Sequence, residues 1–134
     1  MTSIFIISAP SGSGKSRLAL SLVQASETGA LRFSRLVADD RARLQACNGR
    51  LLVRPAEALA GLIEVRGLGI RRLPYEPLAV VGCVVDLGTP EGSRLPEPAE
   101  RKVVIAGIEL PRLAVAPGEQ ALSVTLAWFR TGTA

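Results

Sequence analysis

Residues 4–16 read Ile4-Phe5-Ile6-Ile7-Ser8-Ala9-Pro10-Ser11-Gly12-Ser13-Gly14-Lys15-Ser16, and this stretch decides the fold of the chain. An apolar, β-branched run leads into a loop of Gly and Ser that ends in Gly-Lys-Ser, and an amphipathic helical pattern follows. The backbone N–H groups of such a loop surround a polyphosphate, and the next helix directs its positive end to the same place. The pattern therefore predicts a phosphate-binding loop between a buried strand and a helix.

Two side chains at the end of this loop carry its chemistry. Lys15 is placed to reach the outer phosphates, and Ser16 is placed to offer its hydroxyl to Mg²⁺. The strand and helix patterns on either side disfavour the alternative, a flexible surface turn. The residues expected to hold the phosphates are Ala9, Pro10, Ser11, Gly12, Ser13, Gly14, Lys15 and Ser16.

Composition limits the class of protein. A chain of 134 residues, 48% of them hydrophobic, fits one globular domain. The net charge of +4 permits an anionic ligand, but aromatic residues make up only 4% and no basic run stands out, so nucleic acid is not the expected partner. The longest apolar run, 78–85, is too short to span a membrane, and no signal peptide is visible. A cytoplasmic protein is expected, with Cys47 and Cys83 as buried or inert thiols.

Alternating strand and helix signals predict an α/β fold. Asn48-Gly49 indicates a hairpin, the β-branched run 79–87 indicates a central strand, and 89–101 has the Pro, Gly and charge of a loop. The expected strands are 3–7, 33–38, 44–47, 50–53, 79–87, 103–105 and 108–110. The expected helices are 15–25, 55–60 and 119–129.

Two further constellations suggest chemistry. The run Leu36-Val37-Ala38-Asp39-Asp40 ends a predicted strand in two carboxylates, one to hold Mg²⁺ or its waters and the other to accept a proton from an attacking hydroxyl. The run 63–72 has two glycines around Leu68, which suggests a backbone that approaches a ligand. The alternatives are a solvated acidic turn and a strand-to-turn connection with solvated charges.

The run 36–40, followed by Gly61-Leu62-Ile63-Glu64-Val65-Arg66-Gly67-Leu68-Gly69-Ile70, resembles HPr kinase/phosphorylase. More closely, it is similar to the short proteobacterial form that keeps only the catalytic domain. The resemblance implies one such domain over 1–134, with a phosphate-loop kinase core on a mixed sheet similar to phosphoenolpyruvate carboxykinase. It also implies transfer of phosphate from ATP, or from pyrophosphate, to a serine of the small phosphocarrier protein HPr, in regulation of the phosphotransferase system. Members assemble as hexamers, and many also remove the phosphate.

The resemblance assigns roles by position. Lys15 pairs with the transferred group, and Ser16 and Glu64 contact Mg²⁺. Asp40 matches the acid/base residue, and Asp39 is its acidic neighbour.

A further match and some departures leave alternatives open. Arg94 matches a catalytic arginine of the family. Family members usually carry a His just upstream of the phosphate loop, and this chain has no His; a non-catalytic nucleotide-binding regulator is therefore one alternative. The opening 4–16 also resembles guanylate kinase, which makes a nucleoside monophosphate kinase the other. Residues 116–120 lack the arginines of the loop used for dephosphorylation, so that activity is in question.

Overall fold

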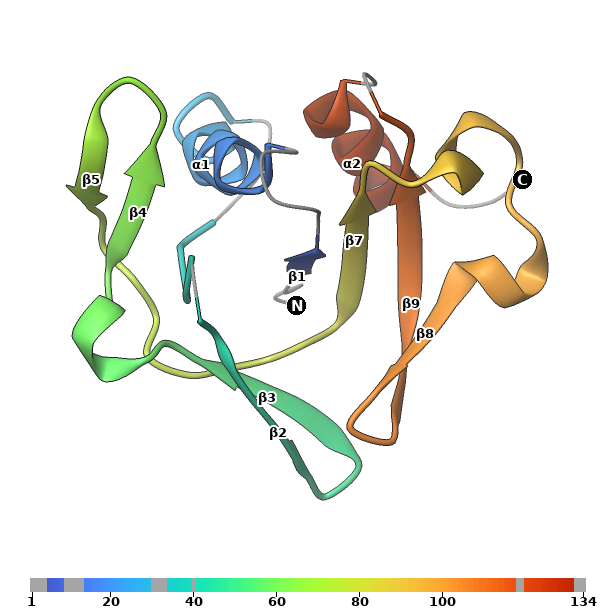
Figure 1. Ribbon diagram of the computed structural model, residues 1–134, viewed down its shortest axis with the longest axis horizontal. Helices are drawn as coiled ribbons and strands as arrows, with labels where there is room; N and C mark the ends of the chain where they lie inside the picture. Colours follow the sequence, from blue (N-terminus) through green and yellow to red (C-terminus); the bar gives the residue numbers. More distant parts are fainter. Residues whose placement is uncertain (1–4, 9–13, 30–33, 40, 118–119, 132–134) are drawn as a thin grey trace. The chain divides into compact units, whose positions relative to one another are not determined.

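The computed structural model describes residues 5–8, 14–29, 34–39, 41–117 and 120–131, the first range by its backbone alone. The chain is α/β with strands in mixed directions (Figure 1). It divides into two compact units, which are described separately. The sheet unit contains residues 1–15, 82–105 and 109–134, and the hairpin unit contains residues 16–81 and 106–108.

The sheet unit is built on a four-stranded sheet in the order β1-β7-β9-β8. Strands β1 and β7 are parallel, as are β7 and β9, and Ser8 at the end of β1 lies beside Asp86 of β7. Strand β7 is almost wholly buried, which suits a parallel strand with neighbours on both sides. Its elements are β1 (Phe5–Ser8), β7 (Cys83–Leu87), β8 (Lys102–Ile105), β9 (Ile108–Val115) and α2 (Ala121–Arg130).

The hairpin unit holds a helix and two antiparallel hairpins. Helix α1 buries Leu18, Leu22 and Ala25, the three residues that its amphipathic pattern places on one face. Leu51, Val53 and Ile63 of the hairpins are also buried. The elements are α1 (Lys15–Ala25), β2 (Arg43–Cys47), β3 (Arg50–Arg54), a 3₁₀ helix (Glu57–Leu59), β4 (Leu62–Val65), β5 (Gly69–Arg72) and β6 (Ala79–Val80).

Local signals predicted several elements correctly. Helix α1 has the expected bounds, and the hairpin turns at Asn48-Gly49 with φ of 52° and 75°, as a two-residue primed turn requires. Helix α2 begins at Ala121, and the loop 89–101 contains only two short 3₁₀ helices. The helix expected at 55–60 is a 3₁₀ helix of three residues.

Two strand predictions are wrong. The run 79–87 is not one strand, because β6 pairs with β3 while β7 pairs with β1 and β9, with Val81 and Gly82 between them. Residues 34–38 form no strand: Leu36 makes a single bridge to Tyr75, and the hydroxyl of Ser34 bonds carbonyls of α1, so this segment packs along the helix instead of joining a sheet. No helix in the described part of the chain is long and apolar enough to cross a membrane.

The two cysteines differ in environment, and this gives a first prediction. Cys83 is buried in β7, and burial raises the pKa of its thiol to about 12, whereas Cys47 is exposed. Because the thiolate is the reactive form, iodoacetamide at neutral pH should modify Cys47 and spare Cys83 until the protein is unfolded. Peptide mass mapping after a timed reaction measures this; equal modification of both thiols in the native protein would contradict it.

Candidate nucleotide site

Three residues predicted for the site meet at the start of α1. The hydroxyl of Ser16 donates a hydrogen bond of 2.7 Å to Oδ1 of Asp39, and the backbone N–H of Glu64 donates one of 3.1 Å to Oδ2 of the same carboxylate. All three belong to the hairpin unit. Asp39 is therefore the residue that joins the phosphate-loop serine to the strand of the third motif.

Hydrogen bonds hold the segment 34–39 at its first residue and at its middle. The hydroxyl of Ser34 bonds the carbonyl of Leu22 at 2.6 Å, and the N–H of Glu76 bonds the carbonyl of Leu36 at 2.8 Å. The distance from Leu22 to Ser16 along the helix is about 9 Å. The extended segment that follows Ser34 is long enough to cover this distance. The chain thus runs back along α1 and delivers Asp39 to Ser16.

Strands β4 and β5 present Glu64 and the paired glycines of the third motif. Glu64 lies in β4 opposite Ile70 and is exposed. Gly67 and Gly69 have φ of 86° and 87°, and a Cβ added at either would meet no atom within 4 Å. The positive φ explains why glycine is favoured at both positions, and the open space beside them leaves the approach of this backbone to a ligand a prediction.

The structure describes only part of the predicted phosphate loop and of the acidic pair. Lys15 is the first residue of α1 and is partly exposed, and Gly14 before it has φ of 89°. Residues 9–13 and Asp40 lie outside the described residues. Arg41, which follows Asp40, has φ of 54°, a conformation uncommon for a residue with a side chain and concentrated at functional turns.

The oxygen atoms of this cluster suit Mg²⁺. Magnesium prefers hydroxyl, carboxylate and phosphate oxygens and keeps several waters. The described residues contain no group of three or more His, Cys, Asp or Glu arranged to hold a metal. Mg²⁺ binding by Ser16, Asp39 and Glu64 stays a prediction, in which the phosphates of a nucleotide supply further oxygens, as is usual in kinases.

The two hydrogen bonds of Asp39 predict a stability effect. The Asp39→Ala variant should lose about 1–2 kcal/mol of unfolding free energy, because a charged acceptor of two bonds is removed. Urea denaturation measures this against Glu57→Ala, which removes an exposed carboxylate from the same unit and should change stability by less than about 0.5 kcal/mol. An equal effect of both variants would show that the Asp39 bonds contribute nothing.

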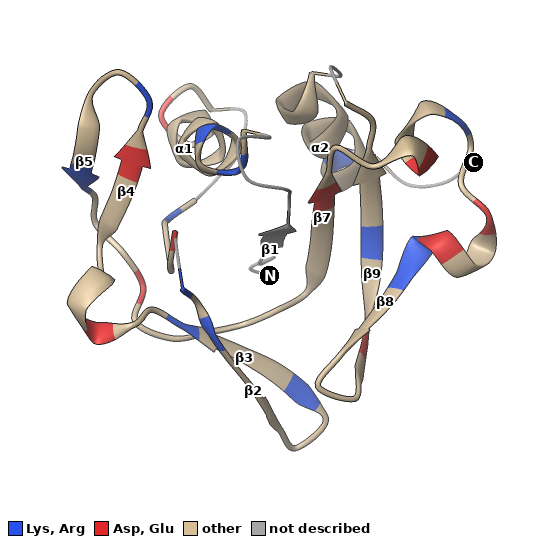
Figure 2. Ribbon diagram, viewed as in Figure 1, with Lys and Arg blue, Asp and Glu red and all other residues tan. Residues whose placement is uncertain are grey.

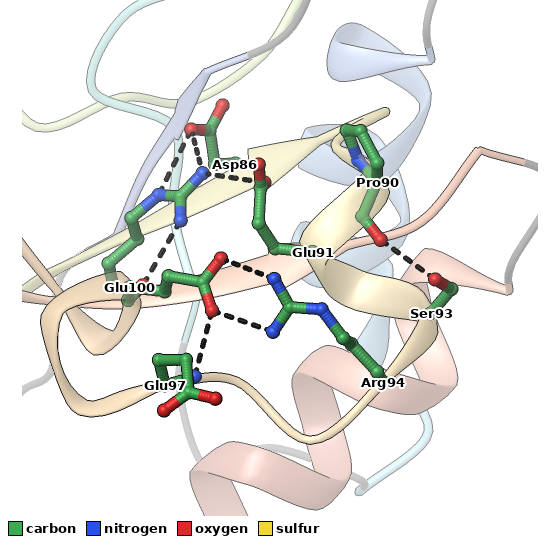
Figure 3. A network of polar contacts seen from close by, with 8 residues as sticks. Asp86, Pro90, Glu91, Ser93, Arg94, Glu97 and Glu100 are labelled. Carbon is green, nitrogen blue, oxygen red and sulfur yellow. Dashed lines mark hydrogen bonds and ion pairs between the residues drawn. The ribbon is translucent and has the colours of Figure 1, made fainter.

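Arg94 lies in an ion-pair network of the sheet unit (Figure 3). Its two terminal nitrogens donate to the two carboxylate oxygens of Glu100 at 2.7 and 2.8 Å, and the N–H of Glu97 bonds the same carboxylate at 2.8 Å. The guanidinium thus forms a two-bond pair with a carboxylate of its own loop, and its side chain is 52% exposed. The catalytic role of Arg94 stays a prediction.

Asp86 is a carboxylate that the sequence reasoning overlooked. It ends the apolar run of β7 and lies beside Ser8, the last residue of the strand that leads into the phosphate loop. Ligands of parallel sheets bind at the carboxyl ends of the strands, where Ser8 and Asp86 lie. The sequence signal that could have identified Asp86 is an apolar run that ends in Asp. Here its Oδ2 accepts bonds from Nε and Nη2 of Arg112 at 3.1 and 2.8 Å, and Arg112 also bonds the carbonyl of Glu100 at 3.0 Å.

The Glu100 pair predicts a pH effect. The hydrogen bond from Arg94, and next the one from the Glu97 backbone, lower the pKa of Glu100 from 4.5 to about 2. A lowered pKa in the folded state stabilises the fold above about pH 4.5, and this contribution is lost as the pH falls towards 2. Glu100→Gln should therefore lower the melting temperature at pH 7 and flatten its decline between pH 4.5 and 2. Melting curves across this range check it; parallel curves for both proteins would contradict it.

Known proteins resemble this chain over part of its sequence and over most of its fold. No family model matches the chain. The HPr kinase/phosphorylase of Clostridium tetani is 37% identical over 84 residues, which are 63% of this chain and 25% of that protein. The protein of the same name from Streptococcus thermophilus is 47% identical over 66 residues, 48% of this chain and 19% of that protein. The matched segments thus span a quarter or less of these relatives.

A solved structure extends the similarity to most of the chain. The HPr(Ser) kinase/phosphatase of Coxiella burnetii matches with a TM-score of 0.74 and 25% identity, over 94% of this chain and 80% of that one. The α/β class with mixed sheets is confirmed, and the finer similarity to phosphoenolpyruvate carboxykinase stays a prediction. The chain is similar to the HPr kinase/phosphorylases in sequence over about half its length and in fold over nearly all of it. This similarity confirms the resemblance that the motifs predict.

Proposed function

We propose that this chain is an HPr kinase, which transfers the terminal phosphoryl group of ATP to a serine hydroxyl of the phosphocarrier protein HPr. The cluster of Ser16, Asp39 and Glu64 carries the proposal, because it unites the three motifs of the resemblance around one carboxylate. The similarity to the HPr kinase/phosphorylases named above adds support. The hexameric assembly and the cytoplasmic location stay predictions.

The charges of these residues suit phosphoryl transfer, which needs positioning and charge neutralisation more than covalent chemistry. Lys15, at the first turn of α1, provides a positive charge beside the phosphates. The Ser16 hydroxyl donates its hydrogen bond to Asp39, so the lone pairs of its oxygen are directed away from that carboxylate and stay available to a cation. Mg²⁺, when bound, neutralises the charge that develops on the phosphate oxygens.

The acceptor serine needs a group that orients its hydroxyl and takes its proton. We assign this to Asp40, which follows the Ser16-bonded Asp39 in the chain. The serine oxygen forms a bond to the terminal phosphorus, the bond from phosphorus to the bridging oxygen breaks, and ADP leaves with the bond electrons. The proposal is confined to this direction, because residues 116–120 contain no arginine for the reverse reaction.

Acceptor-dependent ADP formation tests the proposal. ADP should form from Mg-ATP when HPr is added and should not form with an HPr whose acceptor serine is replaced by Ala. Formation of ADP with GMP or AMP in place of HPr would instead indicate a nucleoside monophosphate kinase. ATP binding without ADP formation with any acceptor would indicate a nucleotide-binding regulator.

A further inference from the structure

The β2–β3 hairpin carries its arginines on one face. Directly opposed residues of antiparallel strands project to the same side, and the register pairs Arg43 with Arg54 and Cys47 with Arg50. Alternation places the buried Leu51 and Val53 on the opposite side. We call the exposed side the arginine face; it consists of Arg43, Gln45, Cys47, Arg50, Leu52 and Arg54.

This face is positively charged without internal compensation. The sequence has no acidic residue between Asp40 and Glu57, and Figure 2 shows basic segments on both strands of the hairpin and no acidic one. In the described residues no acidic partner bonds Arg43, Arg50 or Arg54. The hairpin unit has ten arginines against six acids, whereas the sheet unit has six basic and six acidic residues, so the net charge of +4 belongs to the hairpin unit.

The arrangement costs stability, which suggests that it serves a partner. Like charges directly opposite each other, as in the Arg43–Arg54 pair, destabilise a sheet. Charges on an edge strand do keep copies of a protein from pairing, and this accounts for Arg43 in β2. It does not account for Arg50 and Arg54, which lie in the inner strand β3 between β2 and β6.

The backbone of β2 offers a place for a further strand. The sheet order is β2-β3-β6, and no strand of the described residues pairs with the outer edge of β2. All five residues of β2 are exposed. The two-residue turn at Asn48-Gly49 sets the pairing so that Leu44 and Ala46 direct their backbone N–H groups away from β3. Extended peptides bind such edges by adding a strand.

We propose that the β2 edge and the arginine face bind an extended acidic segment of a partner protein. The segment adds to β2 as a strand, and its alternate carboxylates lie beside the three arginines. The face carries no aromatic ring on which a base would stack, so a protein segment fits it better than a nucleic acid does. This interaction is separate from the proposed kinase activity.

A labelled peptide of alternating Glu and Val tests the proposal by fluorescence anisotropy. It should bind the wild-type chain, and the peptide with Gln in place of Glu should bind at least about tenfold more weakly. Arg43→Glu should weaken binding of the acidic peptide by a similar factor. The same substitution places opposite charges across from Arg54, so the melting temperature should rise. Lower affinity together with higher stability separates loss of a binding residue from damage to the fold.

Two further variants complete the test. Ala46→Pro removes an outward N–H and keeps every arginine, and it should also weaken binding by about tenfold. Arg71→Glu, at an equally exposed arginine of β5, is the matched control and should bind like the wild type. Equal loss in the Arg71 variant, equal binding of the Gln peptide, or displacement of the acidic peptide by oligo(U) at lower concentration than by unlabelled peptide would overturn the proposal. Self-association that Ala46→Pro abolishes would assign the edge to a second copy and overturn it as well.

Discussion

Replacing Asp40 with asparagine should lower the rate of phosphoryl transfer to HPr by about 10²–10⁴-fold, the usual contribution of a general base. Asparagine keeps the size and the hydrogen bonding of the side chain but cannot take the proton of the acceptor serine. ATP affinity should stay close to that of the wild type, because Asp40 is assigned to the acceptor and not to the nucleotide. Transfer of radiolabel from ATP measures the rate, and calorimetric titration measures the affinity.

The control for this variant is Glu57→Gln, which neutralises an exposed carboxylate of the 3₁₀ helix in the same unit and should leave the rate unchanged. A rate unchanged by Asp40→Asn would reject Asp40 as the base. A fall in ATP affinity that equals the fall in rate would place Asp40 in nucleotide binding instead.

Replacing Lys15 with alanine should remove at least about half of the stabilisation by Mg-ATP. A ligand that binds only the folded state, at a hundred times its Kd, stabilises by about 2.7 kcal/mol. Loss of the lysine charge beside the phosphates should weaken binding at least about tenfold, which removes about 1.4 kcal/mol or more. The rise in melting temperature on adding Mg-ATP measures this directly.

The chain supplies a matched control in Lys102, its other lysine. Lys102 is 63% exposed and forms a long 3.6 Å pair with Glu109, so Lys102→Ala removes the same charge from the sheet unit at a site without a predicted ligand. It should keep the full thermal shift. An equal rise in melting temperature in the Lys15→Ala variant and in the wild type would contradict the phosphate-loop interpretation.

The sequence predicted the elements whose signals are local. The period of Leu18, Leu22 and Ala25 gave the bounds of α1, and Asn48-Gly49 gave the first hairpin, because both depend on residues a few positions apart. The break between β6 and β7 could not be seen in this way. Both halves of 79–87 are apolar, and only their pairing with different strands separates them.

In the candidate site, too, contacts between residues far apart in the sequence could not be predicted. Motif order identified Ser16, Asp39 and Glu64 as members of one site, with Asp39 as the acidic neighbour of Asp40 in a pair expected to hold Mg²⁺ and take a proton, but it did not predict that Asp39 bonds both Ser16 and the backbone of Glu64. Its central position depends on bonds to residues 23 and 25 positions away, which no local pattern reports. The Arg94–Glu100 pair could have been predicted, because its members are only six positions apart in a loop that carries charges of both signs.

The proposed kinase activity is tested most directly by finding where the label of radioactive ATP goes. The chain is incubated with Mg-ATP and HPr, and the labelled peptide of HPr is isolated and sequenced. We predict label on one serine of HPr, dependent on Mg²⁺ and lost in the Asp40→Asn variant. ATP binding measured in the same preparation, with no label on HPr, would contradict the account.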